Sequence, residues 1–129
     1  MKSILVSVVL VFLSGVSLLA QDAVIRKKNF NLEDGVAIRG YDAVAYFTQN
    51  KAVKGNKDAA VFYQGATYYF FSAENKEAFK KNPAKYEPQY GGWCAYAMGK
   101  NGDKVEVDPE TFKIIDGKLY LYYNKHFNN

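Results

Sequence analysis

AVFYQGATYYFF, residues 60–71, is the stretch that decides the fold. Two runs of β-branched and aromatic residues flank Gln64-Gly65, and a glycine-containing pair between two such runs is typical of a tight β-hairpin. Alternation along the second run leaves aromatic side chains on both of its faces, with Phe71 on the same face as Tyr69. Both faces are therefore apolar, and we expect the sheet to be covered on both sides.

The next stretch, SAENKEAFKKNP (72–83), predicts a helix. Ser72 is a good N-cap, and an Asn-Pro pair ends the segment. The apolar stripe of this helix consists of Ala78 and Phe79 only. We therefore expect the helix to lie on the surface of the domain.

A second hairpin is predicted near the C-terminus, in FKIIDGKLYLYY (112–123). Asp116-Gly117 lies between two apolar runs, and such a pair favours a turn in which both central residues have positive φ. Gly117 is accordingly a structural residue, because glycine adopts positive φ without strain.

Two short helices are predicted between the hairpins. WCAYAMG (93–99) is rich in alanine and ends at Gly99, a suitable C-cap. VDPETF (107–112) predicts a single helical turn with Asp108 as its cap and proline at the first helical position. The fold class is thus α+β: a small antiparallel sheet built from hairpins, with short helices, in a single domain.

The first twenty residues predict export. Lys2 precedes an apolar run over residues 4–13, and small or apolar residues lead to Ala20. This is the pattern of a secretory signal peptide, residues 1–20, cleaved after Ala20. An uncleaved membrane anchor is the alternative, but the apolar run is short for a membrane span. We expect a periplasmic or secreted protein that has no membrane association after cleavage.

The rest of the chain suits one small domain. Residues 21–34 are polar and predict a flexible lead-in, and residues 35–129 form the domain. The chain has 17 basic and 13 acidic residues, and this mild, scattered excess argues against nucleic-acid binding. Eleven tyrosines and nine phenylalanines accompany a single cysteine, so large aromatic side chains must fill the core in place of disulfides. A binding surface of exposed tyrosines is the second interpretation.

Four stretches together resemble the YHS-domain family in its exported bacterial form. They are GYDAVAYF (40–47), YQGATYYFFSAENKEAFKKNPAKY (63–86), PQYGGWCAYAMG (88–99), and VDPETF with DGKLYLYYN (107–124). The resemblance covers roughly residues 38–125 and implies an α+β fold. It also implies a metal-binding module, a family property that has no settled reaction attached to it.

The chain departs from the family at one informative place. Metal-type YHS domains carry a Cys-Ser-x-x-Cys element where the hairpin runs into the helix, and the resemblance places Phe71 and Asn75 at those two positions. Soft metal ions need sulfur or imidazole donors, which neither residue offers. We expect both to be structural, with Phe71 in the core and Asn75 near the first helical turn.

Cys94 has three open interpretations: an inert buried thiol, a metal ligand, or a redox or disulfide-forming group. On a helix over residues 93–99, Cys94 and Met98 share a face. A thiolate and a thioether are soft donors that suit copper(I). His126, the only histidine, would be a third ligand if the C-terminal tail folds back. Against this, methionine more often fills a core, and a histidine near a terminus is usually solvated.

Catalysis is the function class with the least support. We expect Asp42 to accept backbone amides in the turn after Gly40, and Asp108 to act as a cap. The sequence has no paired carboxylates, nucleophile elbow or phosphate-binding glycine loop.

The leading hypothesis is a non-enzymatic, exported YHS-like domain that binds a metal ion, with copper as the best candidate, or a small ligand. One alternative is a protein-interaction module of the periplasm that uses exposed tyrosines. Another is an accessory domain of an enzyme that uses Cys94.

Overall fold

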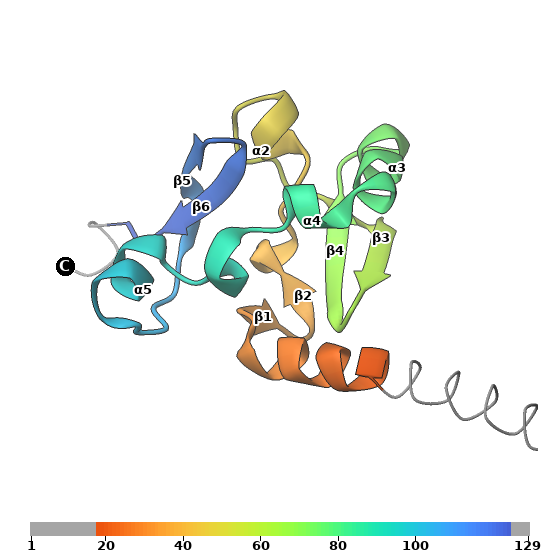
Figure 1. The fold of residues 1–129 in the computed structure, drawn as a ribbon. Helices are drawn as coiled ribbons and strands as arrows, with labels where there is room; N and C mark the ends of the chain where they lie inside the picture. Colours follow the sequence, from red (N-terminus) through yellow and green to blue (C-terminus); the bar gives the residue numbers. More distant parts are fainter. Residues whose placement is uncertain (1–17, 125–129) are drawn as a thin grey trace, which may run out of the picture.

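The strands of the computed structural model, which describes residues 18–124, form two sheets (Figure 1). The larger sheet has the order β1-β2-β4-β3, with β1 Leu32–Glu33, β2 Val36–Ala37, β3 Asn56–Tyr63 and β4 Ala66–Phe70. The smaller sheet pairs β5 Asp108–Ile115 with β6 Lys118–Tyr122. Neighbouring strands are antiparallel except β2 and β4, which pair in parallel through Val36 and Thr67. The α+β prediction is confirmed, with two small sheets in place of one.

Short helices connect and cover the sheets. They are α2 Ala45–Thr48, α3 Ala73–Lys81, α4 Pro83–Tyr86 and α5 Ala95–Asn101, with 3-10 turns η1 Ile38–Gly40 and η2 Gln89–Gly92. Residues 18–29 are helical as well. Within residues 18–124, no helix is both long enough and apolar enough to cross a membrane.

Both predicted hairpins are present, with the turns that their sequences indicated. Gln64 and Gly65 join β3 to β4 and have φ of 42° and 94°. Asp116 and Gly117 join β5 to β6 and have φ of 52° and 74°. Positive φ at both central positions matches the right-handed twist of the flanking strands, so each turn is determined by its own two residues.

The core lies between the larger sheet, α2, α3 and the second hairpin. Strand β4 buries one face fully, through Ala66, Tyr68 and Phe70. Its other face is only partly covered at Thr67 and Tyr69. The expectation that both faces are covered is therefore correct for one face only.

Helix α3 begins at the predicted N-cap and lies on the surface. The Ser72 Oγ accepts the backbone N–H of Asn75 at 3.1 Å. Phe79 is the one buried residue of the helix. Its ring lies 4.7 Å from that of Tyr68 and 5.0 Å from that of Phe70. A single aromatic side chain thus attaches α3 to the sheet, as its thin apolar stripe indicated.

Two predictions for the second half of the chain are wrong. Gly99 lies inside α5, whose C-cap is Gly102 with φ of 74°. Residues 107–112 do not form a helical turn, because β5 begins at Asp108. The register between β5 and β6 is irregular between Asp108 and Phe112. Proline fits this irregular place in the strand, where a ladder hydrogen bond is already missing.

The segment over residues 21–34 is not the flexible lead-in that its polarity suggested. It continues the helix through residue 29 and then supplies β1. In Figure 1 the helix runs beneath β1, β2 and the turn between β3 and β4. The Arg26 guanidinium donates to the carbonyl O of Gln64 at 2.8 Å and to Glu87 Oε2 at 2.6 Å. The Trp93 indole N–H donates to the carbonyl O of Asn29 at 2.7 Å.

The crossing of the N-terminal helix over the first hairpin can be tested at Gly65. A Cβ there would lie 2.4 Å from the carbonyl O of Ala23, whereas a Cβ at Gly117 would meet nothing within 4 Å. Both positions have positive φ, so alanine is strained at each. We expect Gly117→Ala to lower the free energy of unfolding by about 1 kcal/mol, and Gly65→Ala by at least about 2 kcal/mol. Urea unfolding measures both, and equal losses would show that the helix does not press on the turn.

Candidate metal and ligand sites

Asp42 is a fully buried carboxylate, and each of its oxygens accepts two hydrogen bonds. Oδ1 accepts the backbone N–H groups of Val44 at 2.8 Å and Ala45 at 3.1 Å. Oδ2 accepts the backbone N–H of Phe71 and the side-chain amide of Asn75, both at 2.8 Å. The backbone partners on Oδ1 follow Asp42 directly, as expected of a turn residue. The partners on Oδ2 come from a distant part of the chain and tie the start of α2 to the junction of β4 and α3.

That junction holds Phe71 and Asn75, the two positions that the sequence resemblance aligned with a cysteine pair. Phe71 is 57% exposed, so its predicted place in the core is wrong. Strand β4 ends at Phe70, and the backbone N–H of Phe71 donates to Asp42, which is distant in the sequence, instead of to a neighbouring strand. Asn75 lies in the first turn of α3 and bonds the same carboxylate. The junction is a hydrogen-bonded joint without a soft metal donor.

Cys94 is fully buried at the N-cap of α5. Its N–H donates to the carbonyl O of Val105 at 2.9 Å, and its own carbonyl O accepts the N–H of Met98 at 3.0 Å. The Sγ accepts the backbone N–H of Tyr123 at 3.4 Å. The thiol therefore lies against the segment that follows β6, and Met98 is one helical turn further along the chain.

Met98 and His126 are the other two residues of the predicted copper site. Met98 is half-buried. His126 lies outside the described residues, which end at Asn124. Within residues 18–124, no group of three or more histidine, cysteine, aspartate or glutamate side chains could hold a metal ion. The described part of the chain thus contains the two sulfur-bearing residues but no complete site built from side chains of these four types.

Asp108 holds the irregular start of β5. Oδ1 accepts the N–H of Glu110 at 2.9 Å, and Oδ2 accepts the Thr111 hydroxyl at 3.1 Å and the Asn124 side-chain amide at 3.0 Å. Burial by itself raises the pKa of Asp108, but these three hydrogen bonds, with Arg39 nearby, outweigh it and hold that pKa below its ordinary value. Asp108, predicted as a helix cap, therefore stabilises the irregular start of a β-strand instead.

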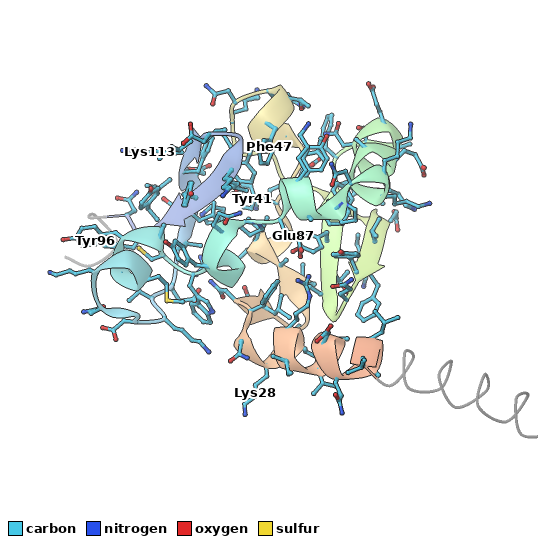
Figure 2. All side chains as sticks on the ribbon, in the orientation of Figure 1. Lys28, Tyr41, Phe47, Glu87, Tyr96 and Lys113 are labelled. Carbon is cyan, nitrogen blue, oxygen red and sulfur yellow. The ribbon has the colours of Figure 1, made fainter. Side chains whose placement is uncertain are left out.

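Two tyrosines belong to the core. The Tyr46 hydroxyl donates to the carbonyl O of Pro109 at 2.7 Å, and the Tyr68 hydroxyl donates to Glu87 Oε2 at 2.5 Å. Burial raises the pKa of both phenols well above the ordinary value. Glu87 also forms an ion pair with Arg26. It lies near the centre of the view in Figure 2. These phenols have protein acceptors, as buried tyrosines require.

Four other tyrosines line an open hollow of about 440 Å³, called here the tyrosine groove. Its lining comes from η2, α5 and the second hairpin, and consists of Tyr90, Ala95, Tyr96, Gly99, Lys100, Ile115, Tyr120 and Tyr122. Tyr90 is 46% exposed and Tyr96 is 54% exposed. Figure 2 shows Tyr96 on the outer side of α5. The sequence indicated an apolar hairpin at residues 112–123, but not which tyrosines face outward.

The family comparison covers the middle of the chain. Residues 44–90 match the family model of the YHS domain. This chain carries a YHS domain. The matched part runs from the start of α2 into η2 and includes both strands of the first hairpin. Comparison with curated proteins and with solved structures found no match.

YHS domains are associated with metal binding, including copper. The family match includes Phe71 and Asn75 but ends before Cys94 and Met98. The matched positions therefore carry no soft donor at the junction of β4 and α3, and the sulfur atoms belong to the part of the chain beyond the match.

The role of Asp42 can be tested by substitution. Asp42→Ala leaves four N–H donors without their acceptor, and we expect it to lower the free energy of unfolding by about 3–5 kcal/mol. Asp42→Asn keeps one oxygen and should cost less. Asp58→Ala, at an exposed position of β3, is the control. Urea unfolding at pH 7 measures all three variants, and a loss for Asp42→Ala within about 1 kcal/mol of the control would contradict the assignment.

The lowered pKa of Asp108 predicts a pH dependence. The folded pKa lies below the ordinary value of 3.8, so the charged carboxylate contributes stability above that value. This contribution is lost as the pH falls through the folded pKa. We expect Asp108→Asn to be less stable than the parent at pH 7 and to lose less stability on acidification below about pH 4. Melting temperatures between pH 7 and pH 2 measure this, with Asp103→Asn as the exposed control.

Proposed function

We propose that this YHS domain is a non-enzymatic, exported protein that binds copper(I) through Cys94, Met98 and His126. The observation that carries the proposal is the contact between the Tyr123 N–H and the Cys94 Sγ at 3.4 Å. It supports the one condition that the sequence left open for His126, because it places the start of the C-terminal tail beside the thiol. His126 is three positions after Tyr123, and a chain of that length spans up to about 10 Å.

The donor set suits a soft ion. A thiolate, a thioether and an imidazole are ligands that favour copper(I) over hard cations such as Mg²⁺ or Ca²⁺. Cys94 is fully buried and Met98 is half-buried, so the sulfur atoms are in a largely apolar setting. An apolar shell limits the access of water to a bound ion and favours a low coordination number. The bound ion would be held, and no reaction is assigned to it.

The absence of enzymatic activity is supported by how the reactive groups are used. Both oxygens of Asp42 accept hydrogen bonds from the protein, and so do both oxygens of Asp108. The Cys94 thiol is buried and accepts a backbone N–H. Nucleophilic catalysis needs an accessible thiolate with a base beside it, and this setting favours a held ion over a reactive nucleophile.

The contacts of the N-terminal helix at Ala23 and Arg26 are compatible with the predicted cleavage and export. The predicted cleavage follows Ala20, and the helix meets the domain at Ala23 and Arg26. Cleavage after Ala20 would therefore leave those contacts in place. We accordingly place the mature protein in the periplasm or outside the cell.

Copper binding is tested by titrating metal-free protein with copper(I) under anaerobic conditions, against a competing chelator. We expect one ion per chain in the parent, loss of this binding in Cys94→Ser, and binding at least about tenfold weaker in Met98→Leu and His126→Ala. Because Cys94 is fully buried, a thiol reagent reaches it only when the surrounding structure opens, and bound copper should slow that reaction further. His126→Asn is a control for size, since it keeps a polar side chain without an imidazole.

Two results would count against the site. Identical weak binding in all the variants would leave Cys94 as a core residue. Tight binding that persists in Cys94→Ser would place the ion elsewhere. Circular dichroism of each metal-free variant separates a lost ligand from a lost fold, because a substitution at a buried cysteine also removes packing.

A further inference from the structure

The tyrosine groove has a floor built by the outward face of the second hairpin. Leu119 and Leu121 of β6 are fully buried, so the alternate residues Tyr120 and Tyr122 face outward. Lys113 of β5 is paired with Tyr120 in the register and shares that face. The floor is therefore a row of phenol rings flanked by a lysine.

The walls of the groove come from η2 and α5. The Tyr90 ring lies 6.4 Å from that of Tyr120. Tyr96 and Lys100 stand on α5, where the Lys100 Nζ lies 5.7 Å from the centre of the Tyr96 ring. Two neighbouring elements of the chain, η2 and α5, and the more distant β6 thus present flat rings to one hollow.

The hydroxyls of these tyrosines are open to a ligand. Tyr46 and Tyr68 in the core each donate to a protein oxygen. Among residues 18–124, none of the four phenol hydroxyls of the groove has a hydrogen-bond partner in the protein. A ligand that enters the groove therefore contacts aromatic rings as well as hydroxyl groups that can form hydrogen bonds with it.

The charge of the groove is positive. Lys100 is its one charged lining residue, and the Lys113 Nζ lies 5.9 Å from the centre of the Tyr122 ring. In the part of the chain that the structure describes, neither lysine has a carboxylate within ion-pair distance. Both charges are free to attract an anionic group.

From these features we infer that the tyrosine groove binds an acidic oligosaccharide. Sugar rings stack on exposed phenol rings through their C–H faces, the sugar hydroxyls bond the free phenols, and the carboxylate of a uronic acid meets Lys100 or Lys113. A purely apolar ligand would leave the phenol hydroxyls and the lysine charges without partners. This inference does not depend on the copper proposal, since the groove lining includes neither Cys94 nor Met98.

The inference is tested by calorimetry of the full mature chain with trigalacturonate at low salt. Maltotriose is the neutral probe of equal length, and triglutamate is an acidic probe without sugar rings. We expect trigalacturonate to bind at least about tenfold more tightly than either control, and its affinity to fall as salt is added.

Variants then locate the bound sugar. We expect Tyr96→Ala and Lys100→Ala each to weaken binding several-fold, and Tyr120→Phe, which removes only a hydroxyl, to weaken it without changing the melting temperature. Phe62→Ala and Lys57→Ala are the matched controls, because both are exposed residues of β3 in the other sheet. They should bind like the parent.

Three outcomes would overturn the inference. They are no measurable binding of trigalacturonate at millimolar concentration, binding that the groove variants leave unchanged, and triglutamate binding as tightly as trigalacturonate. The last outcome would assign the groove to acidic peptides and would thus favour a protein partner.

Discussion

The carboxylate of Asp42 is the interaction on which the rest of this structure depends. It is fully buried, and its four hydrogen bonds attach α2 to the end of β4. Helix α2 in turn carries Tyr46, which donates to Pro109 and packs its ring 4.7 Å from that of Phe112. Through α2, Asp42 therefore helps to position the second hairpin, which also packs against η2, α4 and α5. Since β6 builds the floor of the tyrosine groove and leads to the segment beside Cys94, this carboxylate supports the framework of both proposed sites.

The tyrosines have two different tasks in one small domain. Tyr46 and Tyr68 fill the core and find acceptors at Pro109 and Glu87, so their hydroxyls cost little on burial. Those of the groove have no hydrogen-bond partner for their hydroxyls within residues 18–124, and Tyr90 and Tyr96 expose their rings. A domain of this size, with one cysteine and no disulfide, needs large core side chains. The exposed rings of Tyr90 and Tyr96 lie outside that need, and this is why a ligand surface explains them better than packing does.

The sequence was a good guide where structure is decided by neighbouring residues. Gln64-Gly65 and Asp116-Gly117 each determine a turn through their own φ angles, and Ser72 caps α3 through an amide three residues away. It was a poor guide where the position of a residue depends on a contact with a residue far away in the sequence. Phe71 has an apolar side chain typical of the core, yet its N–H is taken by Asp42, and its side chain is left exposed at the end of β4.

The sequence by itself determined the fold class, the two hairpins and the absence of soft donors at Phe71 and Asn75, because turn chemistry, capping and ligand chemistry are properties of the residues themselves. Only the tertiary structure decided that the N-terminal helix packs on the hairpin through Arg26, that Cys94 lies against Tyr123, and that four tyrosines share one groove. These are contacts between segments far apart in the chain. Their formation depends on which faces are buried together, and a local pattern of residues carries no information about its partner across the core.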